Sequence, residues 1–192
     1  AMQTEFNKYK KDADFVAFKT IHERTRDLSV RDGKPDSLNE FDDEGLLIEV
    51  MRNGHMGYSA TCETTPEGIK HAFQQAIAMT DASSKFPVFK FDRKIRPASK
   101  GRYQTTTKKS LDSLTLAEIY DFLKKTSLKM KSHGQIISSS SDAMIITCHQ
   151  KYLSSEGADF EQSFDIVVNS MSATAQKGSE TQTRSLHGGR GN

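Results

Sequence analysis

The segment Leu28-Ser29-Val30-Arg31-Asp32-Gly33-Lys34 alternates apolar and polar residues and then reaches an Asp-Gly pair. Alternation with a period of two is typical of a half-buried strand. An Asp-Gly pair between two such runs favours a two-residue hairpin turn, because glycine tolerates positive φ. The sequence therefore predicts one strand that ends at Arg31, a turn at Asp32-Gly33, and a return strand from about Lys34 to Phe41.

Further strands are predicted on both sides of this hairpin. Upstream, residues 14–24 are rich in aromatic and β-branched side chains. Downstream, strands are predicted at 46–51 and 55–61, with turns at Asp42-Asp43-Glu44-Gly45 and at Asn53-Gly54. Alternation returns at 135–141, 143–149 and 160–175, and residues 179–185 are expected to pair back on the last of these strands.

Two amphipathic helices are predicted, at Pro66–Ala82 and Thr115–Lys131. The first follows a threonine that can cap it and has proline in its first turn, and the second begins with the capping-box pattern Thr115-Leu116-Ala117-Glu118. Each helix carries an apolar stripe that must cover a sheet face. The predicted fold class is therefore α+β, a mainly antiparallel sheet with two amphipathic helices packed on it.

Composition limits the class of protein. The 192 residues suit one domain, 27% of them are charged, and the net charge is +2. No apolar run is long enough to span a bilayer, so no membrane association is predicted. Cys62 and Cys148 lie in no CxxC or Cys/His cluster. Two such cysteines, with no secretory signal at the start, favour a reduced, cytoplasmic location.

No pattern of residues predicts catalysis. The chain has six histidines, namely His22, His55, His71, His133, His149 and His187. No two of them have the i,i+4 spacing of a metal site on a helix. Cys62 precedes a helix, where a thiol pKa is lowered, but no histidine is near in sequence and a small buried residue is expected. Asp42, Asp43 and Glu44 are interpreted as a solvated turn. We therefore predict no catalytic, cofactor-binding or metal-binding residue in this chain.

A basic segment at 85–109 carries nine Lys or Arg residues and a single acid, Asp92. Aromatic residues are interleaved with these charges, namely Phe86, Phe89, Phe91 and Tyr103. Such a stripe can bind phosphates while its aromatic rings stack on bases, so a nucleic-acid-binding module is the alternative function. The more common interpretation is a solvated linker whose aromatic side chains hold it to the domain.

The order of several phrases resembles a known family. They are Leu28–Lys34, then Asp43-Glu44-Gly45-Leu46, then Gly54–Thr61, and then the helix start at Thr65-Pro66-Glu67. Ser155-Glu156-Gly157 and a hairpin from 172–175 to 183–185 follow later. Together they resemble the amino-terminal domain of the TldD/PmbA family, the proposed modulators of DNA gyrase. The resemblance covers roughly residues 13–190, so residues 1–192 are expected to form that domain.

The resemblance implies a cytoplasmic zinc metallopeptidase system in which a TldD-type and a PmbA-type subunit pair and cleave peptides. In that family the zinc-binding HExxxH helix belongs to the carboxy-terminal half, and nothing in this sequence matches it. The metallopeptidase domain, its zinc and its catalytic residues are therefore expected outside this chain, which alone is expected to be inactive. The resemblance also implies a helix ahead of the first strand, whereas only about a dozen residues precede Asp14, so a short amino terminus is expected.

Overall fold

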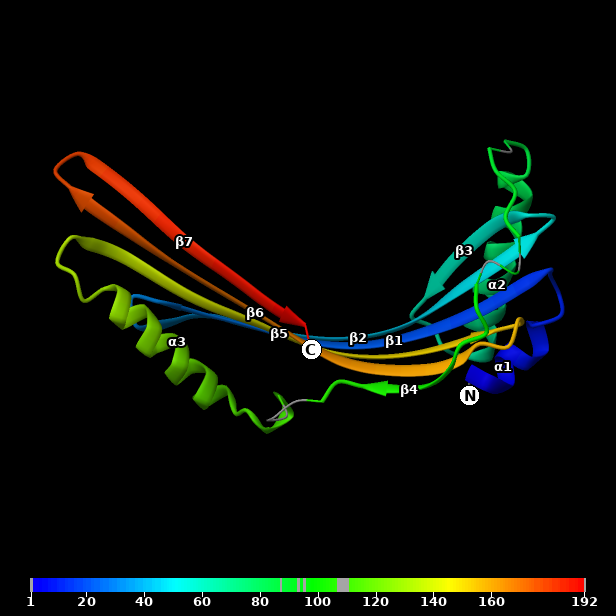
Figure 1. Cartoon of the computed structure of the whole chain (residues 1–192), viewed down its shortest axis with the longest axis horizontal. Coiled ribbons are helices and arrows are strands. Elements are labelled where there is room, and N and C mark those ends of the chain that lie inside the picture. Colours follow the sequence, from blue (N-terminus) through cyan, green and yellow to red (C-terminus); the bar gives the residue numbers. More distant parts are fainter. Residues whose placement is uncertain (1, 87, 93, 95, 107–110, 192) are drawn as a thin grey trace. The chain divides into compact units, whose positions relative to one another are not determined.

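The computed structural model of the chain describes residues 2–86, 88–92, 94, 96–106 and 111–191 (Figure 1). The elements in chain order are α1 (Met2–Tyr9), β1 (Phe15–Arg31), β2 (Lys34–Arg52), β3 (His55–Thr61), α2 (Pro66–Ser83), β4 (Lys100–Gln104), the 3-10 turn η2 (Leu111–Ser113), α3 (Leu116–Met130), β5 (Ile136–Ser154), β6 (Asp159–Lys177) and β7 (Glu180–Gly191). The chain divides into two compact units. Unit 1 comprises residues 1–22, 43–104 and 149–163, and unit 2 comprises residues 23–42, 105–148 and 164–192.

The strands form a seven-stranded sheet in the order β3-β2-β1-β5-β6-β4, with β7 paired to β6. The β2–β3 and β6–β7 pairs are antiparallel, and the β4–β6 pair is parallel. The predicted α+β class with a mainly antiparallel sheet is therefore confirmed. The hairpin turns are also confirmed, since φ is positive at Asp32 (51°), Gly33 (77°), Asn53 (51°) and Gly54 (80°).

Several predicted boundaries are wrong because the strands run further than their sequence pattern indicates. Residues 15–24 and 28–31 belong to the single strand β1, and residues 136–141 and 143–149 belong to β5. The predicted turn at Asp42–Gly45 lies inside β2. The three acids of that segment are exposed there, and an exposed stretch of strand accommodates acidic side chains without a turn.

Two elements were missed, both in segments that were expected to be irregular. The helix α1 lies where only a short terminus was expected, so the structure has three α-helices in its described residues. Phe6 of α1 is 4% exposed and meets the Phe18 ring edge-on at 5.5 Å, and Tyr9 stacks on Phe73 at 4.6 Å. The strand β4 lies within the expected connection at 85–112 and pairs with residues 159–163 of β6. Residues 87, 93, 95 and 107–110 of that connection lie outside the described part.

In unit 1, α2 packs on the strands through a shared apolar core. Alternate residues of β2, namely Leu46, Ile48 and Val50, are buried together with one face of α2. That face comprises Ile69, Ala72, Phe73 and Ala76. Thr65 caps the helix by accepting a hydrogen bond from the Gly68 amide at 3.1 Å. The predicted helix at 66–82 is thus confirmed, with one further residue at its end.

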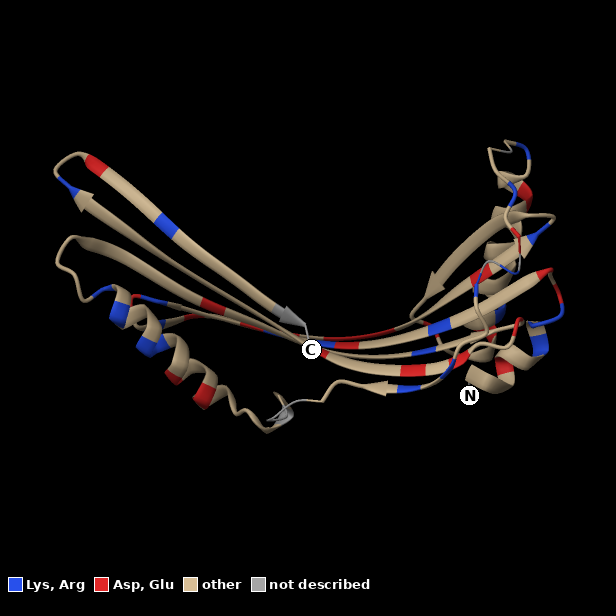
Figure 2. Cartoon of the chain, viewed as in Figure 1, with Lys and Arg blue, Asp and Glu red and all other residues tan. Residues whose placement is uncertain are grey.

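In unit 2, α3 covers Leu28 and Val30 of β1 and Ala143 and Ile145 of β5 through its buried face. The predicted capping box at Thr115 and Glu118 is formed. Figure 2 shows acidic residues in the first half of α3 and basic residues in the second half, an order that complements the helix dipole.

Polar contacts tie the end of α3 to the Asp32-Gly33 turn. The Gly33 amide donates to Ser127 Oγ at 3.1 Å, and the Ser127 hydroxyl lies 2.8 Å from the Ser139 hydroxyl. Asp32 pairs with Lys131 at 2.8 Å and accepts a hydrogen bond from the Ser139 amide at 2.9 Å. The bond from Lys131 and then that from Ser139 lower the pKa of Asp32. The turn and the helix therefore hold each other in place.

Gly57 permits the close approach of α2 to β3. A Cβ atom at this position would overlap the Ala76 carbonyl oxygen and lie 2.8 Å from Thr80 Cγ2. We expect Gly57→Ala to lower the free energy of unfolding by about 1–3 kcal/mol, because the helix would have to move away from the strand. Gly134→Ala is the matched control, since a Cβ there meets nothing within 4 Å. Urea denaturation of both variants measures the difference, and equal stabilities would contradict this account.

Candidate functional site

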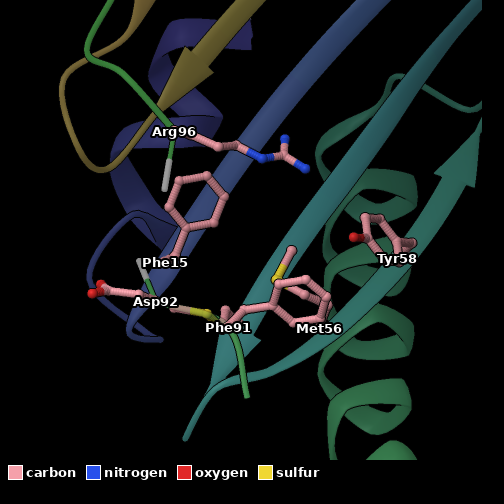
Figure 3. Close-up of a pocket in the computed structure, with 7 residues that line it drawn as sticks. Phe15, Met56, Tyr58, Phe91, Asp92 and Arg96 are labelled. Atoms are coloured by element: carbon pink, nitrogen blue, oxygen red, sulfur yellow. The ribbon is translucent and has the colours of Figure 1, made fainter. Parts of the chain in front are cut away.

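A small pocket opens in unit 1 beside the β2–β3 turn (Figure 3), with a volume of about 80 Å³. Its lining residues come from β1, β2, β3 and the connection after α2, and they are Phe15, Met51, Met56, Tyr58, Phe91, Asp92 and Arg96. The connection is held against the turn because the Phe91 amide donates to the Gly54 carbonyl at 2.9 Å. The lining is mostly apolar, and its size suits one apolar side chain.

Of the residues that line this pocket, Arg96 also belongs to a polar cluster with Glu49 and Tyr152. Arg96 forms an ion pair with Glu49, and its Nη1 lies 3.1 Å from Tyr152 Oη. Tyr152 Oη donates to Glu49 Oε2 at 3.3 Å, and the Glu49 side chain is only 10% exposed. The Arg96 guanidinium also lies 5.8 Å from the centre of the Phe15 ring. The cluster attaches the connection after α2 to the sheet, and the charges of Arg96 and Glu49 compensate each other.

The protonation of this cluster follows from its burial. Burial raises the pKa of Tyr152, with the hydrogen bond from Arg96 acting in the opposite direction. Burial alone would lower the pKa of Arg96, but the Tyr152 hydroxyl and the Glu49 charge raise it overall. Tyr152 therefore stays neutral and Arg96 stays charged at ordinary pH. Neither is poised to transfer a proton, so the arrangement suits binding and structural support.

Within the described residues, the histidines, cysteines and acids noted in the sequence do not gather into a metal site. No group of three or more His, Cys, Asp or Glu able to hold a metal occurs in the described part of the chain. His71 is exposed, whereas His55 is 9% exposed within β3 and His149 Nδ1 lies 2.8 Å from Ser163 Oγ. Cys62 is exposed, so the expectation of a small buried residue there is wrong. It lies just after β3, in the link that leads to the cap of α2, where no element covers it.

The outer edge of β3 is partly satisfied by α2. The Tyr58 amide donates to Met79 Sδ at 3.3 Å, and Ser83 Oγ donates to the Met56 carbonyl at 3.3 Å. The pairing of β3 with β2 is one-to-one from His55 to Thr61. The backbone of α2 approaches this strand closely at Gly57. A peptide that paired with this edge would have to displace the Met79 and Ser83 contacts.

The basic segment is partly neutralised by carboxylates. Arg96 pairs with Glu49, and Arg102 Nε lies 3.3 Å from Glu161 Oε2. Phe91 lines the pocket and meets the Phe89 ring edge-on at 5.1 Å. Lys85, Lys90, Lys94 and Lys100 are exposed, as are Phe86 and Tyr103. Nucleic-acid binding by this segment therefore stays a prediction that only its exposed part can support.

Comparison with known families matches residues 21–80 to the model described as PmbA/TldA metallopeptidase domain 1. Residues 21–80 therefore match the first domain of that family. The matched residues contain all four ordered phrases between Leu28 and Glu67, so the resemblance drawn from the sequence is confirmed. A comparison with curated proteins gives no match.

Three solved structures share this fold. A proposed modulator of a DNA gyrase from Thermotoga maritima is 16% identical, with a TM-score of 0.66 over 98% of this chain and 42% of that one. TldE from Thermococcus kodakarensis is 15% identical, and the match has a TM-score of 0.70 and covers 99% of this chain and 42% of TldE. A proposed modulator of DNA gyrase from Bacteroides thetaiotaomicron is 16% identical, and the match has a TM-score of 0.69 and covers 97% of this chain and 43% of that one. The chain thus spans about two fifths of their length.

We expect Arg96→Met to lower the free energy of unfolding by about 1–3 kcal/mol, because the largely buried Glu49 carboxylate loses its cation. Arg102→Met is the matched control, and it should change stability by less than about 1 kcal/mol because that arginine side chain is 83% exposed. Urea denaturation compares the two variants. Adding Glu49→Gln should recover part of the loss in the Arg96 variant, and an equal effect of the two arginine substitutions would refute a structural role for the cluster.

Proposed function

We propose that this chain is the non-catalytic amino-terminal domain of a TldD/PmbA-type metallopeptidase subunit. In the whole subunit it would help to wall the channel that admits peptide substrates and would support pairing with a second TldD- or PmbA-type subunit. The observation that carries the proposal is the match of residues 21–80 to the first domain of a metallopeptidase family, in a chain that spans 42–43% of the solved structures like it.

The charged side chains of unit 1 support a role without catalysis. Arg96, Glu49 and Tyr152 satisfy one another, and none of them pairs with a nucleophile. The zinc, which in a metallopeptidase polarises the scissile carbonyl and activates water, would be held by a carboxy-terminal domain. The peptide chemistry of the whole subunit would therefore be supplied outside the residues described here.

Strand β7 supports the pairing role. Among the strands that the structure describes, β7 pairs with β6 alone, and residues 180–189 are exposed. An edge strand of this length offers a row of unpaired backbone groups to another strand. Leu186 adds an apolar contact, since 63% of its surface is exposed. We infer that this hairpin is a docking surface for the rest of the enzyme.

The proposed location is the cytoplasm. Cys62 and Cys148 are both free thiols, which suits a reducing compartment. None of the helices in the described residues is long and apolar enough to cross a bilayer.

The first test uses the chain as it stands. We expect it to hydrolyse no fluorogenic peptide and to contain well under one zinc per chain by atomic absorption, because the described residues include no cluster of three or more His, Cys, Asp or Glu that could hold a metal. Stoichiometric zinc, or hydrolysis that a chelator abolishes, would overturn the non-catalytic role.

A second test addresses pairing. In a full-length subunit that contains this domain, we expect Leu186→Lys to lower the fraction of paired subunits, because a charge would replace an exposed apolar contact beside the open edge of β7. Leu38→Lys is the matched control, at a leucine that is 44% exposed. Analytical ultracentrifugation measures the paired fraction, and an unchanged fraction in the Leu186 variant would argue against docking at β7.

A further inference from the structure

A second cavity in unit 1 lies among α1, the start of β4 and the turn that joins β5 to β6, and its volume is about 480 Å³. Its floor includes two buried apolar side chains, Phe6 at 4% exposure and Leu153 at 2%. This cavity is separate from the small pocket beside the β2–β3 turn, because the two share no lining residue.

The charge around this cavity is predominantly positive. Lys10 and Lys11 reach it from the end of α1 and Lys100 from β4, whereas Asp159 is the one carboxylate among the residues that line it. The Lys10 ammonium donates to the neutral Asn7 Oδ1 at 2.9 Å. Within the described residues, the ammonium groups of Lys11 and Lys100 have no hydrogen-bond or ion-pair partner. Among the side chains that line the cavity, three ammonium groups and one carboxylate leave a net charge of +2.

Uncharged donors complete the wall. Ser155 Oγ accepts a hydrogen bond from the Val16 amide at 3.0 Å, which fixes the hydroxyl and leaves its hydrogen free to donate into the cavity. The Asn7 side chain uses its oxygen for Lys10, so its amide hydrogens are also available. The cavity thus combines several donors with an apolar floor.

We propose that this cavity binds a phosphate group. A terminal phosphate carries nearly two negative charges at neutral pH and has three strong acceptor oxygens, so it matches both the net charge and the number of ammonium groups. A carboxylate carries one charge and would leave the other uncompensated. Lysine binds phosphate as a point charge, and the Phe6 and Leu153 floor would contact the carbon skeleton of an organic phosphate. The same chemistry could come from a small phosphomonoester or from the backbone of a nucleic acid.

Titration of the chain with inorganic phosphate at low ionic strength tests the site. We expect saturable binding that weakens about tenfold in each of Lys11→Gln and Lys100→Gln, because each removes one charge-assisted contact. Lys125→Gln on α3 is the matched control, and it should change the Kd by less than about twofold because it alters only the net charge. Thermal unfolding verifies that all three variants remain folded. Absence of saturable binding, or equal weakening by the control, would overturn the proposal.

Two further probes distinguish the sources of phosphate. Saturable binding of ribose 5-phosphate that the Lys11 and Lys100 substitutions abolish would assign the site to small phosphomonoesters. Binding of an oligothymidylate without terminal phosphates, abolished by the same substitutions, would assign it to nucleic-acid backbone. If neither probe responds to the substitutions, the assignment of a phosphate site fails whatever the outcome for the proposed peptidase role.

Discussion

Two turns that adopt positive φ, at Asp32-Gly33 and Asn53-Gly54, set the register on which the packing of this domain depends. In a strand, a slip of one residue moves every side chain to the opposite face. In unit 1 such a slip would expose Leu46, Ile48 and Val50, and in unit 2 it would expose Leu28 and Val30. The local preference of Asx-Gly pairs therefore controls which residues are available to form each core.

In each unit, one helix contacts a glycine of the sheet or its turn: α2 contacts Gly57, and α3 contacts Gly33. In unit 1, the absence of a side chain at Gly57 lets the backbone of α2 lie directly over β3, and Met79 and Ser83 of the helix satisfy groups at the strand edge. In unit 2, the amide of Gly33 donates to Ser127 of α3, and Asp32 pairs with Lys131. Helix α2 thus stabilises the edge of β3, and helix α3 stabilises the Asp32-Gly33 turn. The strands in turn provide the surfaces on which the two helices pack.

The candidate site shows why charge patterns along a chain are poor guides to binding. Arg96 belongs to a basic stretch that predicts affinity for phosphates, yet its charge is satisfied by Glu49, which lies 47 positions away, and by Tyr152, which lies 56 positions away. The lysine-lined cavity draws on α1, β4 and the β5–β6 turn, three segments that no sequence pattern connects. The sites of this domain arise from the assembly of segments, and the histidines, cysteines and acids noted in the sequence do not form one.

Local physics determined a large part of this fold from the sequence alone. The Asx-Gly turns, the capped helices α2 and α3 and the ordered phrases that resemble the TldD/PmbA family all depend on residues close in the sequence. The tertiary structure decided the rest, namely α1, β4, the full lengths of the long strands and the two cavities of unit 1. A helix of eight residues and a strand of five are not stable by themselves. They form because distant partners, Phe18 and Phe73 for α1 and β6 for β4, supply the contacts that compensate for their ordering.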